Sequence, residues 1–571
     1  MDDATRVAID IARIPFSRYG AYVSVTEDEA DEGARYLTIR NVRRRFGDDV
    51  AYRLRFLRND ADVDWAVRAT PIAINIESCE GTALIYIRND RSLVIDSRGL
   101  DVSLKQISGY GYGINQGDRC FELISVPQRF YTMIHVQKGR AVLSGPIVPG
   151  RGDMQIDRRQ ELAVSCEEGG VTLCLEMSIV ERSIDLPISV DNDLQSIERE
   201  WEMFQQAMPE VPADREDFCR VTWYNLWSSF VRAEDTYKYD AMLMSKKYMS
   251  SVWTWDHCFN ALAIAPADLN TAIEQFLLPF ELQSESGALP DMWNPNSEVV
   301  WGVTKPPIHG WCFSKIMSRF QVSDSVLRKV YRHLVMWTQW WMDRRDFDQD
   351  GVPEYPQGCD SGWDNSTLFD LGYFIETPDL AAYLVLQMKT LSDIADRLGD
   401  SASARMWEER SRTLLCRLYQ HSWVGDRFVA KQSGTHKYVE RPTSLLALMP
   451  LVLGDILEKS KFDRLVEILE RDFLTENGPA TEALASKWYN SDGYWRGPIW
   501  APSTYLLVDG LRRGGRNDLA TRIASGFCDM VQHKAKGNYE NFDAKTGKGL
   551  RAPGYTWTAS VFLLLVWEYL T

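Results

Sequence analysis

Hydrophobic and polar residues alternate along much of the first third of the chain. In the segment VTLCLEMSIV, polar side chains occupy one face of a strand and the other face carries Val171, Leu173, Leu175, Met177 and Ile179. Such alternation predicts a half-buried antiparallel strand. The same two-residue period recurs in five further segments: AYRLRFLR, ALIYIRN, SLVIDS, RFYTMIHVQ and ELAVSC. Turn-forming sequences separate them, namely ND, EGG, GD and SRG. Short strands at turn spacing favour a β-sandwich, which we expect over residues 1–185 in a supporting role.

The period changes after residue 185. The segment LQSIEREWEMFQQAM has helical spacing, and PEVPADRED then supplies prolines and an Asp that can cap the next helix. We therefore expect a helical linker over residues 186–214. Beyond it, about a dozen long segments repeat their apolar residues at three and four positions, as amphipathic helices do. The sequence predicts a mainly α domain over residues 215–571.

These predicted helices are of two kinds. SLLALMPLVLG and ASVFLLLVWEY are apolar nearly all round, whereas DSVLRKVYRHLVMWTQW has one apolar and one polar face. An inner ring of buried helices inside an outer amphipathic ring, an α/α barrel, would produce this alternation. Long aromatic loops stand before or between the apolar helices, and we expect them to gather at one end of the barrel: WNPNSEVVWGVTKPP, PQGCDSGWDNS, YNSDGYWRGPIW and NYENFDAKTGKGLRAPGYTW.

Composition narrows the class of ligand. The chain is 45% hydrophobic and 25% charged, which is typical of a soluble globular protein. Its 20 Trp and 24 Tyr suit carbohydrate, because indole and phenol faces pack against the C–H faces of sugars, although large helical cores also use Trp. The net charge of −16, without a basic stripe, argues against a nucleic-acid partner. A neutral or cationic small molecule fits better.

The cysteines, the histidines and the N-terminal segment give further expectations. Ten scattered cysteines contain no CxxC, and seven histidines, His135 in a strand among them, show no HExxH, so zinc chemistry is not expected. The segment MDDATRVAIDIARIPF is acidic where a signal peptide is basic. No apolar run, including the tail VFLLLVWEYLT, has the length of a membrane span. We expect a reduced, cytoplasmic protein that does not bind membranes; the sequence does not indicate the oligomeric state.

An acidic stretch of another kind is DFDQDGVPEYPQGCDSGWDNSTLFD, residues 346–370, in which glycines, prolines and aromatics separate the carboxylates. Carboxylates this dense repel one another unless a cation, a basic partner or a shared proton offsets the charge. It can be a solvated acidic loop or an active-site loop between two helices. Hydrolysis of a glycosidic bond needs one carboxylic acid and one carboxylate. Asp364 in SGWDNS and Glu540 in GNYENFDAKTG are the candidates in aromatic loops.

The start of the same stretch resembles a calcium-binding loop. Positions one, three, five and nine of such a loop are filled by Asp346, Asp348, Asp350 and Glu354, with Gly351 at position six. Position twelve is Gln357, where a bidentate Glu is needed. A structural calcium, with Glu408 or Glu409 as a further ligand, and a plain acidic turn are the two alternatives. No cofactor is expected to take part in the chemistry.

Four motifs in this order resemble glycoside hydrolase family 63, over about residues 215 to 571: VWTWDHCFNAL (252–262), RDFDQDGVPEYPQGCDSGWDNS (345–366), YWRGPIWAP (494–502) and NYENFDAKTGKG (538–549). That family includes processing α-glucosidases and mannosylglycerate hydrolases and is related to the family 37 trehalases. The resemblance implies an (α/α)₆ barrel and inversion at the anomeric carbon. It makes Asp364 the general acid and Glu540 the general base, with a gap of about 6.5 to 9.5 Å for water. Trp363 would help to raise the pKa of Asp364 by desolvation.

The resemblance also implies a substrate pocket. Trp255 and Asp256 resemble the wall around the reacting sugar, and Arg496 would donate hydrogen bonds there, with Trp363, Asn365, Trp495, Trp500 and Trp557 completing the shell. The alternatives are a helix cap for Asp256, a structural ion pair for Arg496, and core packing for Trp500 and Trp557.

The leading interpretation is an inverting exo-acting α-glucosidase for short α-glucosides. A mannosylglycerate or glucosylglycerate hydrolase and a trehalase-like enzyme are the nearest alternatives. A glycoside phosphorylase would need no general base, so Glu540 argues against it. A non-catalytic carbohydrate-binding protein is the alternative of another class.

Overall fold

The computed structural model describes residues 7–29, 35–43, 50–107, 111–117, 119–145, 160–234 and 236–571. The chain divides into two compact units. The first comprises Met1–Met208, Asp217–Ser251 and Asn294–Ser297, and the second comprises Pro209–Glu216, Val252–Trp293 and Glu298–Thr571. Residues 217–251 thus belong to the first unit, whereas the sequence-based limits (1–185, 186–214 and 215–571) assigned them to the helical domain. Those domain limits stay a prediction.

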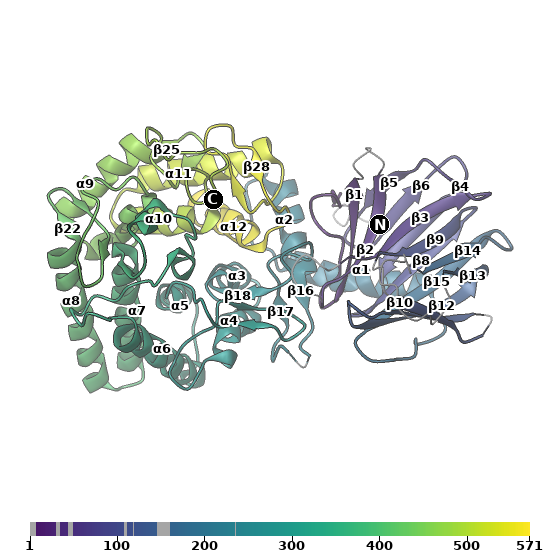
Figure 1. Cartoon of the computed structure of the whole chain (residues 1–571), viewed down its shortest axis with the longest axis horizontal. Coiled ribbons are helices and arrows are strands. Elements are labelled where there is room, and N and C mark those ends of the chain that lie inside the picture. The colour runs from purple at the N-terminus through teal and green to yellow at the C-terminus, as the bar shows by residue number, and fades with distance from the viewer. Residues whose placement is uncertain are drawn as a thin grey trace. The chain divides into compact units, whose positions relative to one another are not determined.

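Two antiparallel sheets build the first unit, as Figure 1 shows. Among the described residues, one sheet contains β1 (Val23–Glu29), β2 (Arg35–Asn41), β3 (Val50–Arg58), β4 (Ala61–Asp62), β9 (Asp101–Gln106), β14 (Glu161–Ser165) and β13 (Arg140–Ser144). The other contains β10 (Gly111–Asn115), β11 (Cys120–Ser125), β12 (Phe130–Lys138), β15 (Gly170–Ser178), β8 (Ser92–Arg98), β7 (Thr82–Ile87), β6 (Ile74–Glu77) and β5 (Ala66–Ala69). The predicted β-sandwich is confirmed.

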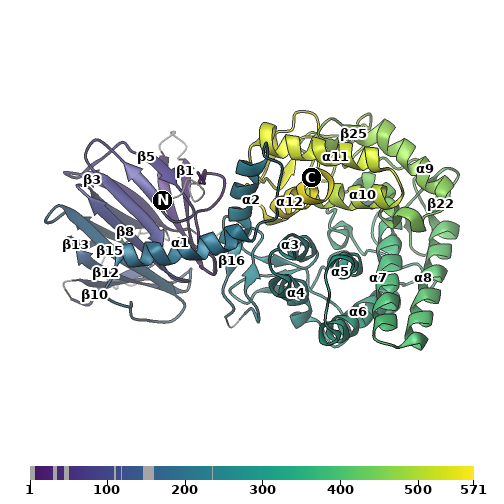
Figure 2. The same cartoon turned by 180° about the vertical axis from the view of Figure 1, so that it is seen from behind.

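One strand is more buried than its pattern predicts. Every residue of β15 is buried, including the polar face that we expected to meet solvent. Helix α1 (Val190–Gln206) covers that face, as Figure 2 shows from behind. The Tyr86 hydroxyl donates to Asp193 of α1 at 2.9 Å, and Arg88 pairs with the same carboxylate at 3.2 Å. The alternating pattern of β15 therefore does not mark a solvent-exposed face, because the polar side of this strand packs against the polar helix α1.

The second unit, all of whose residues are described, is helical. Its inner ring consists of α3 (Asp256–Ile264), α5 (His309–Arg319), α7 (Pro378–Arg397), the 3₁₀ segment η5 (Leu445–Ile456), α10 (Ala501–Arg513) and α12 (Thr556–Tyr569). Each member packs against the next, and α12 packs against α3, which closes the ring (Figure 1). The outer helices α4 (Leu269–Leu277), α6 (Asp324–Arg344), α8 (Ser401–Ser422), α9 (Lys459–Ile468) and α11 (Asn517–Asp529) bury one face each. The (α/α)₆ barrel is confirmed.

The segment η5 was predicted as a helix but is not an α-helix. It is entirely buried from Leu445 to Gly454, as its apolar composition requires, but it carries Pro450 in its interior. Proline has no N–H to donate and its ring clashes with the preceding turn, so regular α-helical bonding is interrupted there.

Short segments complete the chain. Helix α2 (Glu216–Ser229) belongs mostly to the first unit, and η2 (Leu278–Leu282), η6 (Leu469–Phe473) and η7 (Met530–Ala535) extend α4, α9 and α11. Two-residue strands form small ladders: β16 (Phe230–Val231) with β17 (Ala241–Met242), β18 (Val252–Trp253) with β19 (Met292–Trp293) and β20 (Val299–Val300), β21 (Ile375–Glu376) with β24 (Lys431–Gln432), β22 (Trp423–Val424) with β23 (Arg427–Phe428), β25 (Leu474–Thr475) with β26 (Gly478–Pro479), and β27 (Asn541–Phe542) with β28 (Gly549–Leu550). Across the described residues, no helix combines the length and the apolar character that crossing a membrane demands.

Candidate active site

Asp364 stands in a tight loop between two 3₁₀ turns, η3 (Gly358–Ser361) and η4 (Thr367–Leu371), ahead of the inner helix α7. The loop is held close to Trp255 at Gly362, whose φ is 71°. A Cβ on Gly362 would lie 2.8 Å from the indole of Trp255, so the position accepts only glycine without rearrangement.

A buried lysine that the sequence analysis did not single out lies beside Asp364. The Lys305 ammonium is 3.9 Å from Asp364 and 3.1 Å from Asp291, and it donates to the Cys359 carbonyl at 2.9 Å. Burial raises the pKa of Asp364 above its ordinary range, Lys305 acts against that shift, and Asp291 adds to it. Lys305 itself stays charged, because Asp291 and Asp364 raise its pKa more than burial lowers it.

Glu540 comes from the loop before the inner helix α12. The backbones of Ile499 and Phe542 bond each other at 2.7 and 3.0 Å, which aligns the YWRGPIW and NYENF segments. The Glu540 side chain is 7% exposed. Burial raises its pKa to about 7, against the opposing charge of Arg551 and with a contribution from Asp364.

Tyr494, the first residue of YWRGPIW, connects the two carboxyls. Its side chain lies close enough to both Asp364 and Glu540 to lower the pKa of each. Its ring packs edge-on against Trp500 at 4.9 Å, and the Arg551 guanidinium lies 4.9 Å from its centroid. Asp364 and Glu540, far apart in sequence, are therefore brought close together in loops that precede inner helices.

Asp256 belongs to the same electrostatic cluster. It opens α3 and is 3% exposed, and its Oδ2 has no hydrogen-bond partner among the described residues. Burial raises its pKa well above the ordinary value, Lys305 opposes this, and Asp291 and Asp364 reinforce it. The N-cap residue of α3 is Trp255 and no side chain caps the helix, so the helix-cap alternative does not describe Asp256. A buried carboxyl oxygen without a partner is suited to accept a ligand hydroxyl.

The candidate tryptophans pack against one another. Trp363 lies 4.6 Å from Trp495, which stacks on Trp500 at 4.0 Å, and Trp557 meets both Trp500 and Trp255 edge-on. All five are buried, so they form a continuous tryptophan wall rather than an open stacking platform.

Asn365 and Arg496 join the two loops of the site. Asn365 accepts from the Trp495 N–H at 2.9 Å and donates to the Gly493 carbonyl at 3.0 Å. Arg496 donates to the Asn365 carbonyl and pairs with Asp370, each at 2.6 Å. These contacts fit the alternative of a structural ion pair for Arg496, although Asp370 is half-exposed rather than buried.

The sequence analysis missed Lys305, Asp291, Tyr494 and Arg551 as members of the site. Tyr494 lies inside a quoted motif, and Lys305 lies in the long aromatic loop before α5, so motif membership was the available signal for both. Arg551 likewise lies in the aromatic loop before α12, whereas Asp291 lies outside the quoted segments and only the fold brings it to the carboxyls.

The acidic loop holds the candidate calcium ligands in two groups. Oxygens of Asp346, Asp348 and Asp350 lie within 4.8 Å of one another. Glu354 is outside that group; it is fully buried, accepts from the Phe347 N–H at 3.0 Å, and burial raises its pKa to about 8. Of the two suggested further ligands, Glu408 pairs with Lys389 and Arg412 on and beside α8. A calcium ion stays a prediction.

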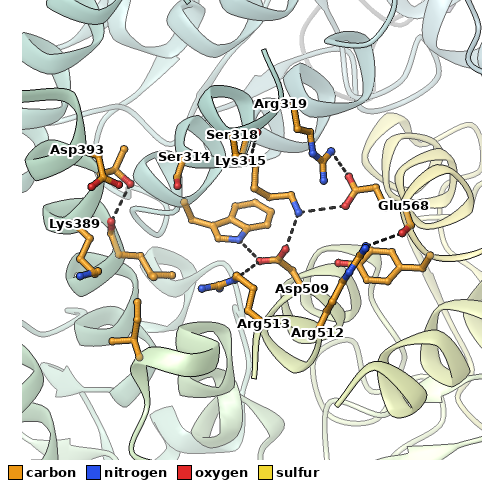
Figure 3. Close-up of a pocket in the computed structure, with 15 residues that line it drawn as sticks. Ser314, Lys315, Ser318, Arg319, Lys389, Asp393, Asp509, Arg512, Arg513 and Glu568 are labelled. Carbon is orange, nitrogen blue, oxygen red and sulfur yellow. Dashed lines mark hydrogen bonds and ion pairs between the residues drawn. The ribbon is translucent and has the colours of Figure 1, made fainter. Parts of the chain in front are cut away.

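A second polar region lies at the other ends of the inner helices (Figure 3). It is a cavity of about 480 Å³, and its lining includes Lys315, Lys389, Asp509, Arg513 and Glu568. Asp509 is nine residues beyond Trp500 in α10, or about 13 Å along the helix axis. Several of its charges are paired: Lys315 lies 2.7 Å from Asp509 and 3.2 Å from Glu568, and Lys389 lies 3.2 Å from Glu408. This region is a network of ion pairs, separate from Asp364 and Glu540.

An (α/α)₆ barrel with two neighbouring buried carboxyls in the loops before its inner helices is the arrangement expected of a glycoside hydrolase, and comparison with known proteins shows that class. Residues 249–558 match the family model described as a mannosylglycerate hydrolase MGH1-like glycoside hydrolase domain. The match covers more than half of the chain. This chain belongs to that family, within glycoside hydrolase family 63.

Named relatives align with the helical part. The mannosylglycerate hydrolase of Rubrobacter radiotolerans is 22% identical over 408 residues, which cover 55% of this chain and 90% of the relative. The glucosylglycerate hydrolase of Mycolicibacterium hassiacum is 23% identical over 409 residues, 55% of this chain and 91% of the relative.

Two solved structures share the fold. A bacterial glucoamylase complexed with acarbose has a TM-score of 0.63 at 12% identity and covers 98% of this chain and 94% of its own. The family 63 mannosylglycerate hydrolase of Thermus thermophilus, in complex with Tris and D-glycerate, has a TM-score of 0.51 at 17% identity and covers 58% of this chain and 96% of its own.

Proposed function

We propose that this glycoside hydrolase cleaves a glycosylglycerate, an α-linked mannosyl or glucosyl glycerate, with inversion. The proximity of Asp364 and Glu540 to each other and to Tyr494 supports the proposal, because inversion needs an acid and a base near one glycosidic bond. Relatives named for mannosylglycerate and glucosylglycerate hydrolysis support this substrate over the short α-glucosides of our leading sequence interpretation. A cytoplasmic location stays a prediction.

In the proposed reaction, Asp364 gives its proton to the oxygen that links the sugar to glycerate. Glu540 takes a proton from a water molecule that attacks the anomeric carbon from the opposite face. The unpartnered Oδ2 of Asp256 would accept a sugar hydroxyl, and the tryptophan wall would hold the carboxyls apart and keep bulk water away. After hydrolysis Asp364 is ionised and Glu540 is protonated. Proton exchange with solvent returns both residues to their starting states.

The pKa values of the unliganded site have a consequence for this cycle. Burial raises the pKa of Glu540 to about 7, whereas Lys305 limits the rise at Asp364. Both shifts favour a protonated carboxyl in the unliganded site, and Asp364 contributes to the raised pKa of Glu540. The reacting form is the tautomer with its proton on Asp364, and pH affects the pair as a unit.

The pH profile of kcat/KM is expected to be bell-shaped, with its alkaline limb near pH 7. Above the Glu540 pKa of about 7 both carboxylates are ionised, and no proton is left for the leaving oxygen. On the acid side activity falls when Asp364 is also protonated, because no base remains. Lys305→Met should move the acid limb to higher pH, since Lys305 favours the ionised Asp364. Initial rates between pH 4 and 9 measure both limbs; a level rate from pH 7 to 9 contradicts the assignment.

A substrate panel tests the function itself. Mannosylglycerate, glucosylglycerate, trehalose and short α-glucosides are offered separately, and proton NMR follows the first anomer that is released. We expect free glycerate and the β-anomer of the sugar, with rates independent of phosphate. Release of the α-anomer excludes inversion, and a preference for trehalose or α-glucosides excludes the glycerate substrate.

A further inference from the structure

Two histidines that are remote in sequence face the acidic loop in the second unit. His421 lies in the last turn of α8 and His436 follows β24, yet their ring centroids are 5.0 Å apart. His421 Nδ1 lies 3.2 Å from Asp350 Oδ2. His436 Nε2 lies 3.1 Å from Asp348 Oδ2 and 3.6 Å from Asp350 Oδ2. Sequence reasoning did not connect this pair, because neither histidine belongs to a spaced motif.

These separations match the edges of a small coordination sphere. Ligands placed about 2.0 to 2.2 Å from a tetrahedral zinc ion lie about 3.3 to 3.6 Å from one another. The three nitrogen–oxygen separations fall between 3.1 and 3.6 Å. The side chains therefore already have nearly the spacing that a tetrahedral ion requires.

A buried carboxylate explains how His421 is oriented. Glu376 is fully buried; its Oε2 lies 2.6 Å from His421 Nε2, and its Oε1 has no hydrogen-bond partner among the described residues. If Nε2 carries the proton and donates to Glu376, the lone pair of Nδ1 points at the Asp350 carboxylate. Two acceptors that face each other are bridged by a proton or by a cation, and a carboxylate behind a metal-binding histidine is a common arrangement.

The local charge points the same way. Five carboxyl groups meet here, since Asp346 and Glu354 lie beside Asp348, Asp350 and Glu376. Asp350 uses Oδ1 to accept from the Val352 N–H at 2.8 Å, which leaves its Oδ2 directed at both imidazoles. A divalent cation at this point would offset the repulsion among these groups.

We propose that His421, His436, Asp348 and Asp350 bind one divalent transition-metal ion of the zinc class, with Glu376 as the carboxylate that orients His421. Ligand atoms of Asp350, His421 and His436 lie within 4.8 Å of one another and of Glu376, and Asp348 joins this group through its Oδ2, 3.1 Å from His436 Nε2. This set differs from the oxygen-only calcium set expected from the sequence, because imidazole nitrogen suits zinc whereas calcium takes oxygen ligands. The site would fasten the acidic loop, α8 and the β24 turn together.

The test uses the untagged full-length protein after removal of metals with EDTA. Calorimetric titration with Zn²⁺ is expected to show one site, and Co²⁺ is expected to give the intense visible absorption of a tetrahedral complex with nitrogen ligands. Glu376→Gln should weaken Zn²⁺ binding about 10- to 100-fold, the usual effect of losing an orienting partner. His436→Gln should weaken it at least as much. The exposed His533 lies outside the cluster, so His533→Gln is the matched control and should bind as the unmodified chain does.

Three results would overturn the proposal. These are Zn²⁺ binding that His436→Gln leaves unchanged, a Co²⁺ spectrum typical of an octahedral oxygen site, and Ca²⁺ binding that Zn²⁺ does not displace. The His436 side chain is 43% exposed, so its replacement should not impair folding, and equal melting temperatures of the metal-free proteins check this. The Co²⁺ spectrum of the unmodified chain needs no variant at all.

Discussion

Asp364→Asn and Glu540→Gln are each expected to lower kcat by about 10² or more while sugar binding survives. Asparagine at 364 cannot protonate the leaving oxygen, and glutamine at 540 cannot take a proton from water. Both replacements keep the shape of the side chain, so the contacts with Tyr494 and the tryptophan wall should remain. Steady-state rates give the loss, and calorimetric titration with the substrate gives the affinity.

The two roles can be separated with an activated substrate. A glycoside with a phenolate-type leaving group needs little protonation, so it should restore much of the rate of Asp364→Asn and little of the rate of Glu540→Gln. Matched controls are Asp324→Asn, whose carboxyl is 72% exposed in α6, and Glu476→Gln, whose carboxyl is 75% exposed. Near-normal rates in either active-site variant would reject the assignment and favour a non-catalytic sugar-binding protein.

The barrel and the β-sandwich were predictable because the spacing of apolar residues in each segment indicates which of its faces is buried. Segments that are apolar all round, such as the one that forms α12, became inner helices, and two-faced segments such as α6 became outer helices. Where prediction failed, the cause was a contact outside the segment or a single residue within it. The polar face of β15 is covered by α1, and Pro450 prevents an α-helix in an otherwise suitable apolar run.

The candidate site was predictable where its residues lie in motifs. Asp364, Glu540 and Asp256 could be selected because their motifs stand in a familiar order. Lys305 could not be assigned a role, since its effect depends on Asp291 and Asp364 meeting it in space, 3.1 and 3.9 Å away. The same limit applies to His421 and His436, which no spacing rule connects. Contacts between residues from different segments of a barrel form only when the ring of helices closes, so local sequence does not reveal them.

The other end of the barrel gives the largest expected effect on stability. Asp509→Ala should lower the free energy of unfolding by about 3 to 5 kcal/mol, the usual result of removing one partner from a buried ion pair. The Asp509 carboxylate accepts from Trp311 at 2.8 Å, from Lys315 at 2.7 Å and from Arg513 at 3.1 Å, and its side chain is 8% exposed (Figure 3). Without this carboxylate, the buried Trp311 N–H has no acceptor, and Lys315 and Arg513 lose a negative partner.

The expected pH dependence distinguishes this ionic effect from lost packing. Burial alone would raise the pKa of Asp509, but Lys315 and Arg513 outweigh it and hold the pKa well below the ordinary value of 3.8. A carboxylate with a lowered folded-state pKa stabilises the fold above its unfolded pKa, and that contribution is lost as pH falls toward the folded pKa. The stability gap between the unmodified chain and Asp509→Ala should therefore be widest at neutral pH and shrink below about pH 3.8.

Denaturant titrations at several pH values, followed by helical ellipticity, measure this gap. Asp463→Ala is the matched control, since Asp463 also pairs with a lysine on a helix, Lys459 at 2.5 Å, but is 45% exposed. It should cost at most about 0.5 kcal/mol, because solvent screens an exposed pair. Equal losses in the two variants, or a gap at Asp509 that does not change with pH, would mean that packing rather than charge holds this end of the barrel together.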